Sequence, residues 1–168
     1  MPTTYDSIAT TTIASSGVTT QIDFTSIPGT YTDLRLVTTG TNNGGGNLWF
    51  SVNADFSAIY FMTSINGNGT SPTSTNSVSA NQWNLNRAGN TSTTIPTMYT
   101  MDFFSYAGST HKTCLMTESS DLNGSGGVSR SVGLYQSTSA ITALRLWLSG
   151  GASFNAGTTA TLYGIKAA

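Results

Sequence analysis

The side chains that could carry chemistry are few and lie far apart in the sequence. His111 is the only histidine and Cys114 the only cysteine. A nucleophilic triad needs a base oriented by an acid beside a nucleophile, and none of the serines lies in a Gly-x-Ser-x-Gly turn. One histidine and one cysteine also give too few ligands for a zinc site within one chain. We therefore expect a solvated turn residue at His111, a small strand residue at Cys114, and no catalytic, cofactor or metal site.

The acidic residues leave one enzymatic alternative open. Two carboxyl groups that the fold brought together could act as a glycosidase pair, although isolated acids on polar faces are the commoner arrangement. Residues 121–126 have a faint likeness to a calcium loop, but they lack an oxygen ligand before the glycine and the terminal glutamate, so we expect a plain turn. The acids are Asp6, Asp23, Asp33, Asp55, Asp102, Glu118 and Asp121.

The composition indicates strands and tight turns. Charged residues make up 8% of the 168-residue chain, and Thr, Ser, Asn and Gly together make up half of it. An average protein is about one quarter charged, so hydroxyl and amide groups must cover most of this surface. Threonine favours pleated strands, while good helix formers are scarce. The length fits a single domain over residues 1–168, and the regular apolar alternation is more than a disordered chain would carry.

The charge pattern and the hydropathy exclude several classes of partner. The six lysines and arginines are spread along the chain and form no basic stripe, so we expect no binding to nucleic acid. No apolar run approaches the length of a membrane span, and the first residues resemble no secretory signal. We therefore expect no contact with a membrane. A single cysteine allows no disulfide within the chain, so we also expect synthesis in a reducing cytoplasm.

Period-2 alternation of apolar residues predicts a series of short strands. Their spacing and turn signals are typical of an all-β, jelly-roll-like antiparallel sandwich of about ten strands. We expect residues 34–40 and 47–54 to pair as a hairpin, and the polar residues 70–77 to be a long mobile loop. The expected strands are residues 5–13, 18–24, 34–40, 47–54, 58–65, 78–87, 97–104, 112–118, 128–135, 141–148 and 159–165.

The same alternation predicts which side chains face outward. Trp49 and Trp147 have the parity opposite to their leucine neighbours, so if the leucines fill the core, both indoles face away from it. Arg35 and Arg145 lie outward in two matching Leu-Arg-Leu segments. Outward tryptophan suggests a contact surface for protein or sugar, unless the fold's own loops cover it. We predict that these four residues belong to an interface.

Three segments carry a resemblance to a known family. They are Phe24–Leu34 (FTSIPGTYTDL), Val132–Ile141 (VGLYQSTSAI) and Thr161–Ala168 (TLYGIKAA). Over most of its length the chain resembles virion proteins of tailed bacteriophages with a jelly-roll-like β-sandwich. Members of that family occur as capsid decoration (cement) proteins and as domains of tail fibres.

The resemblance implies a structural role rather than catalysis. Because the sequence contains no coiled-coil shaft segment, we expect a decoration protein on the capsid exterior. It would be a homotrimer that binds the major capsid protein and bridges neighbouring shell subunits. The alternative is a tail-fibre or tail-tip module that recognises carbohydrate on the host surface with its exposed aromatic residues.

Overall fold

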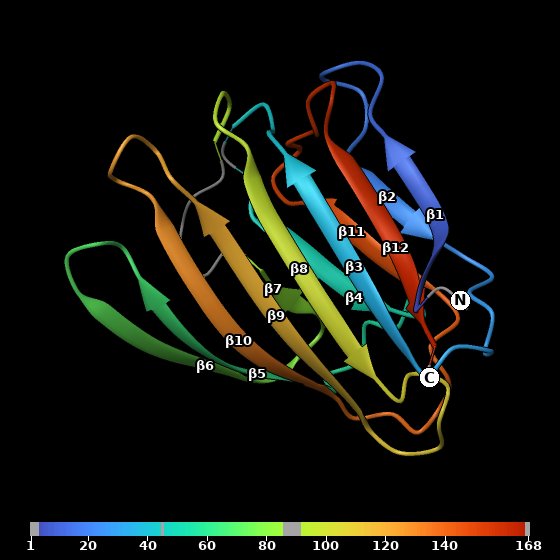
Figure 1. The fold of residues 1–168 in the computed structure, drawn as a ribbon. Helices are drawn as coiled ribbons and strands as arrows, with labels where there is room; N and C mark the ends of the chain where they lie inside the picture. Colours follow the sequence, from blue (N-terminus) through green and yellow to red (C-terminus); the bar gives the residue numbers. More distant parts are fainter. Residues whose placement is uncertain (1–3, 45, 86–91, 167–168) are drawn as a thin grey trace.

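The fold is known from a computed structural model, which describes residues 4–44, 46–85 and 92–166 (Figure 1). In these ranges the chain forms strands joined by turns, and it contains no helix that is long and apolar enough to cross a membrane. The strands are β1 (Tyr5–Thr12), β2 (Gln21–Phe24), β3 (Asp33–Gly40), β4 (Leu48–Val52), β5 (Tyr60–Gly67), β6 (Pro72–Ala80), β7 (Trp83–Asn84), β8 (Thr97–Phe104), β9 (Lys112–Ser120), β10 (Gly127–Tyr135), β11 (Leu144–Leu148) and β12 (Thr159–Ile165).

The strands form two antiparallel sheets that pack face to face. The large sheet has the order β1-β12-β3-β8-β9-β10-β5-β6, and the small sheet has the order β2-β11-β4-β7. Figure 1 shows the small sheet behind the β3 and β8 part of the large sheet. The predicted all-β antiparallel sandwich is confirmed. The jelly-roll connectivity stays a prediction.

One expected pairing is wrong. The segments predicted to form a hairpin, now β3 and β4, belong to different sheets. The chain between them crosses from one layer to the other, and Asn42 forms an isolated bridge with Phe154 there. Gly46 makes this crossing possible, because a Cβ at this position would lie 2.5 Å from the Cβ of Ala152. The glycine-rich segment therefore permits a close passage between the sheets instead of a tight reversal.

The expected mobile loop at residues 70–77 is also wrong, because most of it lies in β6. β6 pairs with β5 from the Gly67–Pro72 pair to the Tyr60–Ala80 pair, with a register shift after the Met62–Ser77 pair. The side chains of β6 are mostly exposed on both faces, so an apolar alternation could not reveal the strand. Of the strand expected at residues 78–87, β7 retains Trp83 and Asn84. Residues 86 and 87 of that expected strand lie outside the described ranges.

The core centres on Trp83, which is fully buried between the sheets. Its ring stacks on Phe50 with the centroids 6.0 Å apart and meets the edge of Tyr60 at 5.3 Å. The indole N–H donates a hydrogen bond of 3.0 Å to the carbonyl oxygen of Phe61. Gly133 of β10 lies against the same ring, because a Cβ built on it would be 2.8 Å from Trp83 Cε2. The absence of a side chain at residue 133 therefore makes room for the indole.

Two buried tyrosines tie the β4–β5 loop to the core. The Tyr60 hydroxyl accepts a hydrogen bond from the Val52 amide (3.0 Å) and donates one to the Asp55 carbonyl oxygen (2.7 Å). The Tyr135 hydroxyl donates to Asp55 Oδ2 at 2.9 Å. Burial, with a smaller effect of the bond to Asp55, raises the pKa of Tyr135 to about 12, and burial also raises the pKa of Tyr60. Both phenols therefore stay neutral in the folded chain as the pH rises past 10.

We predict that Gly133→Ala destabilises the fold by about 1–3 kcal/mol, because the added methyl group pushes against the rigid Trp83 ring. Gly67→Ala is the matched control, since a Cβ at that strand position meets nothing within 4 Å. It should change the free energy of unfolding by less than about 1 kcal/mol. Urea denaturation of the three proteins measures the difference. Equal stabilities of the two variants would contradict the packing described for Gly133.

The second prediction concerns alkaline pH. A phenol whose pKa is raised by folding contributes stability that is complete below the unfolded pKa of about 10 and is lost as the pH rises from there towards about 12. The stability of the wild type should therefore fall over this range. Tyr135→Phe should make the decline shallower, because one of the phenols responsible is gone. Urea denaturation from about pH 8 to about pH 12 tests this, and a decline as steep as that of the wild type would refute it.

Candidate functional site

The outer face of the small sheet carries two tryptophans side by side. Trp49 of β4 and Trp147 of β11 are direct partners in the strand register, and their rings meet edge to face with the centroids 5.8 Å apart. The leucines next to them in sequence, Leu48, Leu146 and Leu148, are buried, whereas both indoles are partly exposed. The predicted outward orientation of the tryptophans is therefore confirmed. Their role in an interface stays a prediction.

A third aromatic ring joins them from the β4–β5 loop. Phe56 is 45% exposed, and its ring meets Trp147 edge to face at 5.7 Å. The tyrosines that hold Asp55 therefore also place the residue beside it. Asn53 and Ala54, which follow β4 and precede Asp55, have positive φ angles of 54° and 52°, and these turn the chain sharply out of the strand.

Asn53 fixes the other side of this loop. Its Nδ2 donates to the Ala140 carbonyl oxygen at 2.8 Å, and its Oδ1 accepts from the amides of Thr142 (2.8 Å) and Ala143 (3.0 Å). The side-chain amide thus bonds to the segment that leads into β11, the strand that carries Trp147. Because the loop is tied on two sides, hydrogen bonds within the chain hold the segment that places Phe56 beside Trp147.

Polar side chains border the rings. Arg145 Nε donates to Asp23 Oδ1 at 2.6 Å, and Gln21 Nε2 donates to Asp23 Oδ2 at 2.8 Å. These residues come from the paired strands β2 and β11. Together the residues form a hollow of about 310 Å³, which we call the aromatic hollow; it is lined by Gln21, Trp49, Phe56, Gln82, Arg145 and Trp147.

The fourth predicted interface residue lies elsewhere. Arg35 is on β3 of the large sheet, where its Nε and Nη2 bind the two oxygens of Asp102 at 2.6 Å and 2.9 Å. Its guanidinium also lies 5.7 Å from the ring centre of Tyr5. The hydrogen bond to Asp102 raises the pKa of Arg35. The matching Leu-Arg-Leu segments therefore make equivalent Arg–Asp pairs in two sheets, and of these two arginines the aromatic hollow contains Arg145.

The remaining candidates for chemistry lie apart from the hollow. His111 is exposed. Cys114 is a fully buried strand residue, and its burial raises the pKa of the thiol. Among the described residues, no three His, Cys, Asp or Glu side chains gather as a metal site would require. Asp6 pairs with Lys166 (2.5 Å), Asp33 at the start of β3 accepts the amide of Ser105, which follows β8 (2.8 Å), and Asp121 accepts the Gly124 amide within a turn (2.7 Å). These acids therefore take part in local structure at separate places.

Glu118 is the one acid that the structure buries among the described residues. It lies opposite Tyr99 in the β8–β9 register, on the inner face of the large sheet. Burial, and secondarily the charge of Glu118, raises the pKa of Tyr99. Sequence reasoning did not separate Glu118 from the solvated acids, although Glu118 has the same parity on β9 as Cys114 and Met116, so its inward position could have been read.

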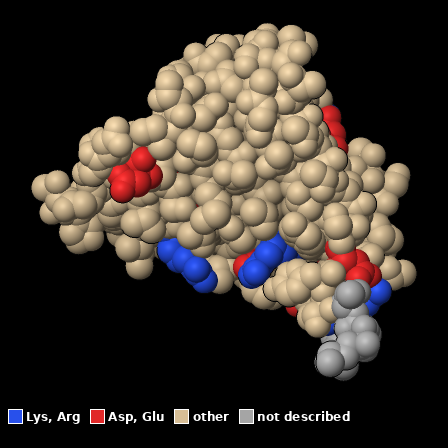
Figure 2. All heavy atoms as spheres, turned by 45° about the horizontal axis from the view of Figure 1, so that its top comes forward, with Lys and Arg blue, Asp and Glu red and all other residues tan. Residues whose placement is uncertain are grey.

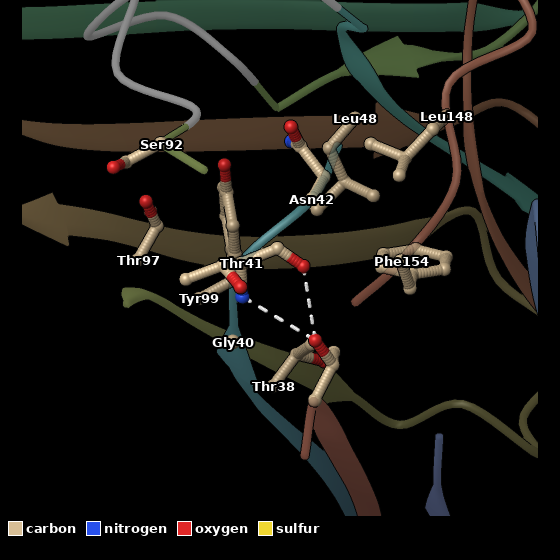
Figure 3. Close-up of a pocket in the computed structure, with 11 residues that line it drawn as sticks. Thr38, Gly40, Thr41, Asn42, Leu48, Ser92, Thr97, Tyr99, Leu148 and Phe154 are labelled. Carbon is tan, nitrogen blue, oxygen red and sulfur yellow. Dashed lines mark hydrogen bonds between the residues drawn. The ribbon is translucent and has the colours of Figure 1, made fainter. Parts of the chain in front are cut away.

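The small cavity drawn in Figure 3 is too small for a substrate. Its volume is about 20 Å³, which is room for one water molecule. Leu48, Leu148 and Phe154 form one wall, and threonine and asparagine side chains form the other. Thr158 Oγ1 donates to the Thr41 carbonyl oxygen at 3.0 Å beside it. The cavity is a packing gap at one end of the sandwich.

A wider groove of about 560 Å³ lies between turns at one end of the large sheet. Glycine, serine and asparagine residues from 67–69 and 119–127 form much of its wall, and Pro96, Met98 and Val128 add apolar side chains. Asp121, the charged residue among those that line it, already accepts the Gly124 amide. The aromatic hollow, with its rings and fixed polar groups, is therefore the stronger candidate for recognition.

Sequence reasoning identified the two tryptophans and Arg145, and it missed the rest of the hollow. Phe56 and Gln82 lie in segments between strands, where alternation does not apply. Gln21 does alternate with buried Ile22 on β2, so its outward position could have been read. That it lies next to Trp147 depends on the pairing of β2 with β11, which are distant in sequence.

Comparisons with protein-family models, with curated proteins and with solved structures found no match to this chain. The grounds for a function are therefore the geometry of the aromatic hollow and the resemblance carried by the sequence.

Proposed function

We propose that this chain is a structural protein of a bacteriophage virion, a capsid decoration protein that binds the outside of the shell through the aromatic hollow. The observation that carries the proposal is the cluster of Trp49, Trp147 and Phe56 on an outer sheet face, bordered by Arg145. Tryptophan and arginine are the residues most enriched where protein interfaces are strongest. The resemblance to virion proteins supplies the setting and the partner, the major capsid protein.

The hollow suits a rigid contact. Hydrogen bonds within the chain hold its Arg145–Asp23 pair and the loop that carries Phe56, so little conformational entropy is lost when a partner docks. Only 8% of the residues of the chain are charged, and Figure 2 shows the charged side chains on one face of the molecule as isolated spots. Apolar burial rather than charge steering would therefore dominate binding.

Stabilisation of the shell follows from mass action. A protein that binds the assembled shell and not its separated subunits favours assembly by an amount that grows with its concentration. An interface of roughly 1,000 Å² or more per contact would suffice. Bridging neighbouring subunits requires at least two contacts on each decoration unit, which the homotrimer expected from the resemblance would provide. This function requires no catalysis.

We predict that Trp147→Ala weakens binding to shells that lack this chain by at least about tenfold, because a central indole leaves the contact. Arg145→Ala should weaken binding as well. Arg35→Ala is its matched control, since it breaks the equivalent Arg–Asp pair on the other sheet and should leave shell affinity unchanged. Cosedimentation of purified chain with such shells measures the affinity. Equal affinities for all the variants would refute docking through the hollow.

A carbohydrate-binding role at the tail is the second candidate, and the amides of Gln21 and Gln82 beside the rings favour it. Aromatic rings can stack on the apolar face of a sugar, and amides can bond neighbouring hydroxyl groups. Under this function, NMR titration with fragments of host surface polysaccharide should shift the indole N–H signals of Trp49 and Trp147. The isolated chain should also block adsorption of the phage. If no sugar shifts those signals and the chain binds shells, the tail role is excluded.

A further inference from the structure

One edge of the large sheet is formed by β6, and within the described part of the chain this edge is open. On one side β6 pairs with β5. On its other side, none of the strands in the described part of the chain pairs with it. Alternate N–H and C=O groups of an edge strand point away from its neighbour and form a row that another strand can bind. Figure 1 shows β6 at one end of the sheet, away from the small sheet.

Natural proteins usually protect such an edge, and β6 has little of this protection. From Pro72 to Ala80 it contains no charged residue, it is nine residues long, and its single proline is at its first position. Its irregular pairing with β5 is confined to the end near Ala80. The opposite edge, β1, is shielded by a bulge between Ser7 and Ala9 and by an ion pair between Asp6 and Lys166.

The side chains of β6 are also mostly exposed, whereas a strand of this length is normally stabilised by burying one of its faces. Apart from Ser77 and Ala80, they are exposed, and Val78 is 68% exposed. The ladder to β5 is therefore its main support, and a second ladder on the open side would add hydrogen bonds and shield Val78 in part. These features point to a partner that is itself an extended strand.

Another copy of β6 fits this edge. Antiparallel pairing of two identical strands about a twofold axis places residues near the middle of the strand opposite themselves or their close neighbours. A charged strand would bring like charges together in this arrangement, whereas the Ser, Thr and Asn residues of β6 do not. Cross-strand threonine and serine pairs are favourable.

We propose that two copies of this chain dimerise by antiparallel pairing of their β6 strands, which joins the two large sheets into one continuous sheet. This contact goes beyond the proposed function, because it uses none of the residues of the aromatic hollow. It is also a twofold contact, distinct from the threefold arrangement that the resemblance implies.

A charge-swap experiment tests the dimer. Asn76 is the central and exposed residue of β6. Asn76→Lys and Asn76→Glu should each raise the dimer dissociation constant by at least about tenfold, because like charges then face each other across the axis. An equimolar mixture of the two variants should regain the dimer, since lysine then faces glutamate. Sedimentation equilibrium over a range of concentrations measures the masses.

Thr113→Lys is the control, because it adds the same charge at an exposed strand position on β9, inside the sheet rather than at its edge. It should leave the dimer unchanged, and circular dichroism should show that every variant keeps the fold. The proposal is overturned if the wild type is a monomer at millimolar concentration or assembles only as a trimer. It is equally overturned if the Asn76 variants dimerise as the wild type does, or if mixing them restores nothing. None of these outcomes would contradict shell binding through the aromatic hollow, because the β6 contact uses none of its residues.

Discussion

The packing of the small sheet on the large one through Phe50 and Trp83 is the contact on which the rest of the molecule depends. Phe50 stacks on Trp83 of its own sheet and on Phe103 of the large sheet, with ring centroids 6.0 Å and 5.6 Å apart, and the rings of Trp83 and Phe103 lie 6.4 Å apart, so the three rings form one cluster. Because Phe50 points inward, pleating turns Trp49 outward. The aromatic hollow is therefore a consequence of how the core is filled, and the β4–β5 loop then adds Phe56 to it.

Much of this arrangement could be predicted from the sequence, since alternation reports directly on burial. It placed Leu34 and Leu36 inside and both outer tryptophans outside, and it gave the all-β sandwich. The alternation could not reveal β6, because its side chains are mostly exposed on both faces of the sheet. The backbone ladder to β5 is what stabilises this strand. The tight alternation of β3 and β4 was likewise compatible with a hairpin or with a crossing, because both strands face the same core from opposite sheets.

The two Leu-Arg-Leu segments show where local pattern stops being informative. Each predicts an outward arginine, and each arginine does meet an aspartate on the neighbouring strand. The sequence does not say that β3 lies in the large sheet and β11 in the small one, because strand order depends on pairings between distant segments. Such partly exposed ion pairs contribute at most about 1 kcal/mol each to stability. Their importance for a site is that they hold the side chains in place, and Arg145 is the one held beside aromatic rings.

The aromatic hollow and the β6 edge belong to different sheets, and this separation affects how the chain could bind a surface. A dimer joined through the two β6 strands would present two aromatic hollows, one from each chain, on one rigid body. If both engaged neighbouring sites, the second contact would form at a high effective concentration, and the avidity could exceed that of a single hollow by orders of magnitude without any new residue. A nearly uncharged surface gains little from long-range steering, so it depends on such geometry for tight binding. An open, neutral edge strand would then have a use that offsets its tendency to aggregate.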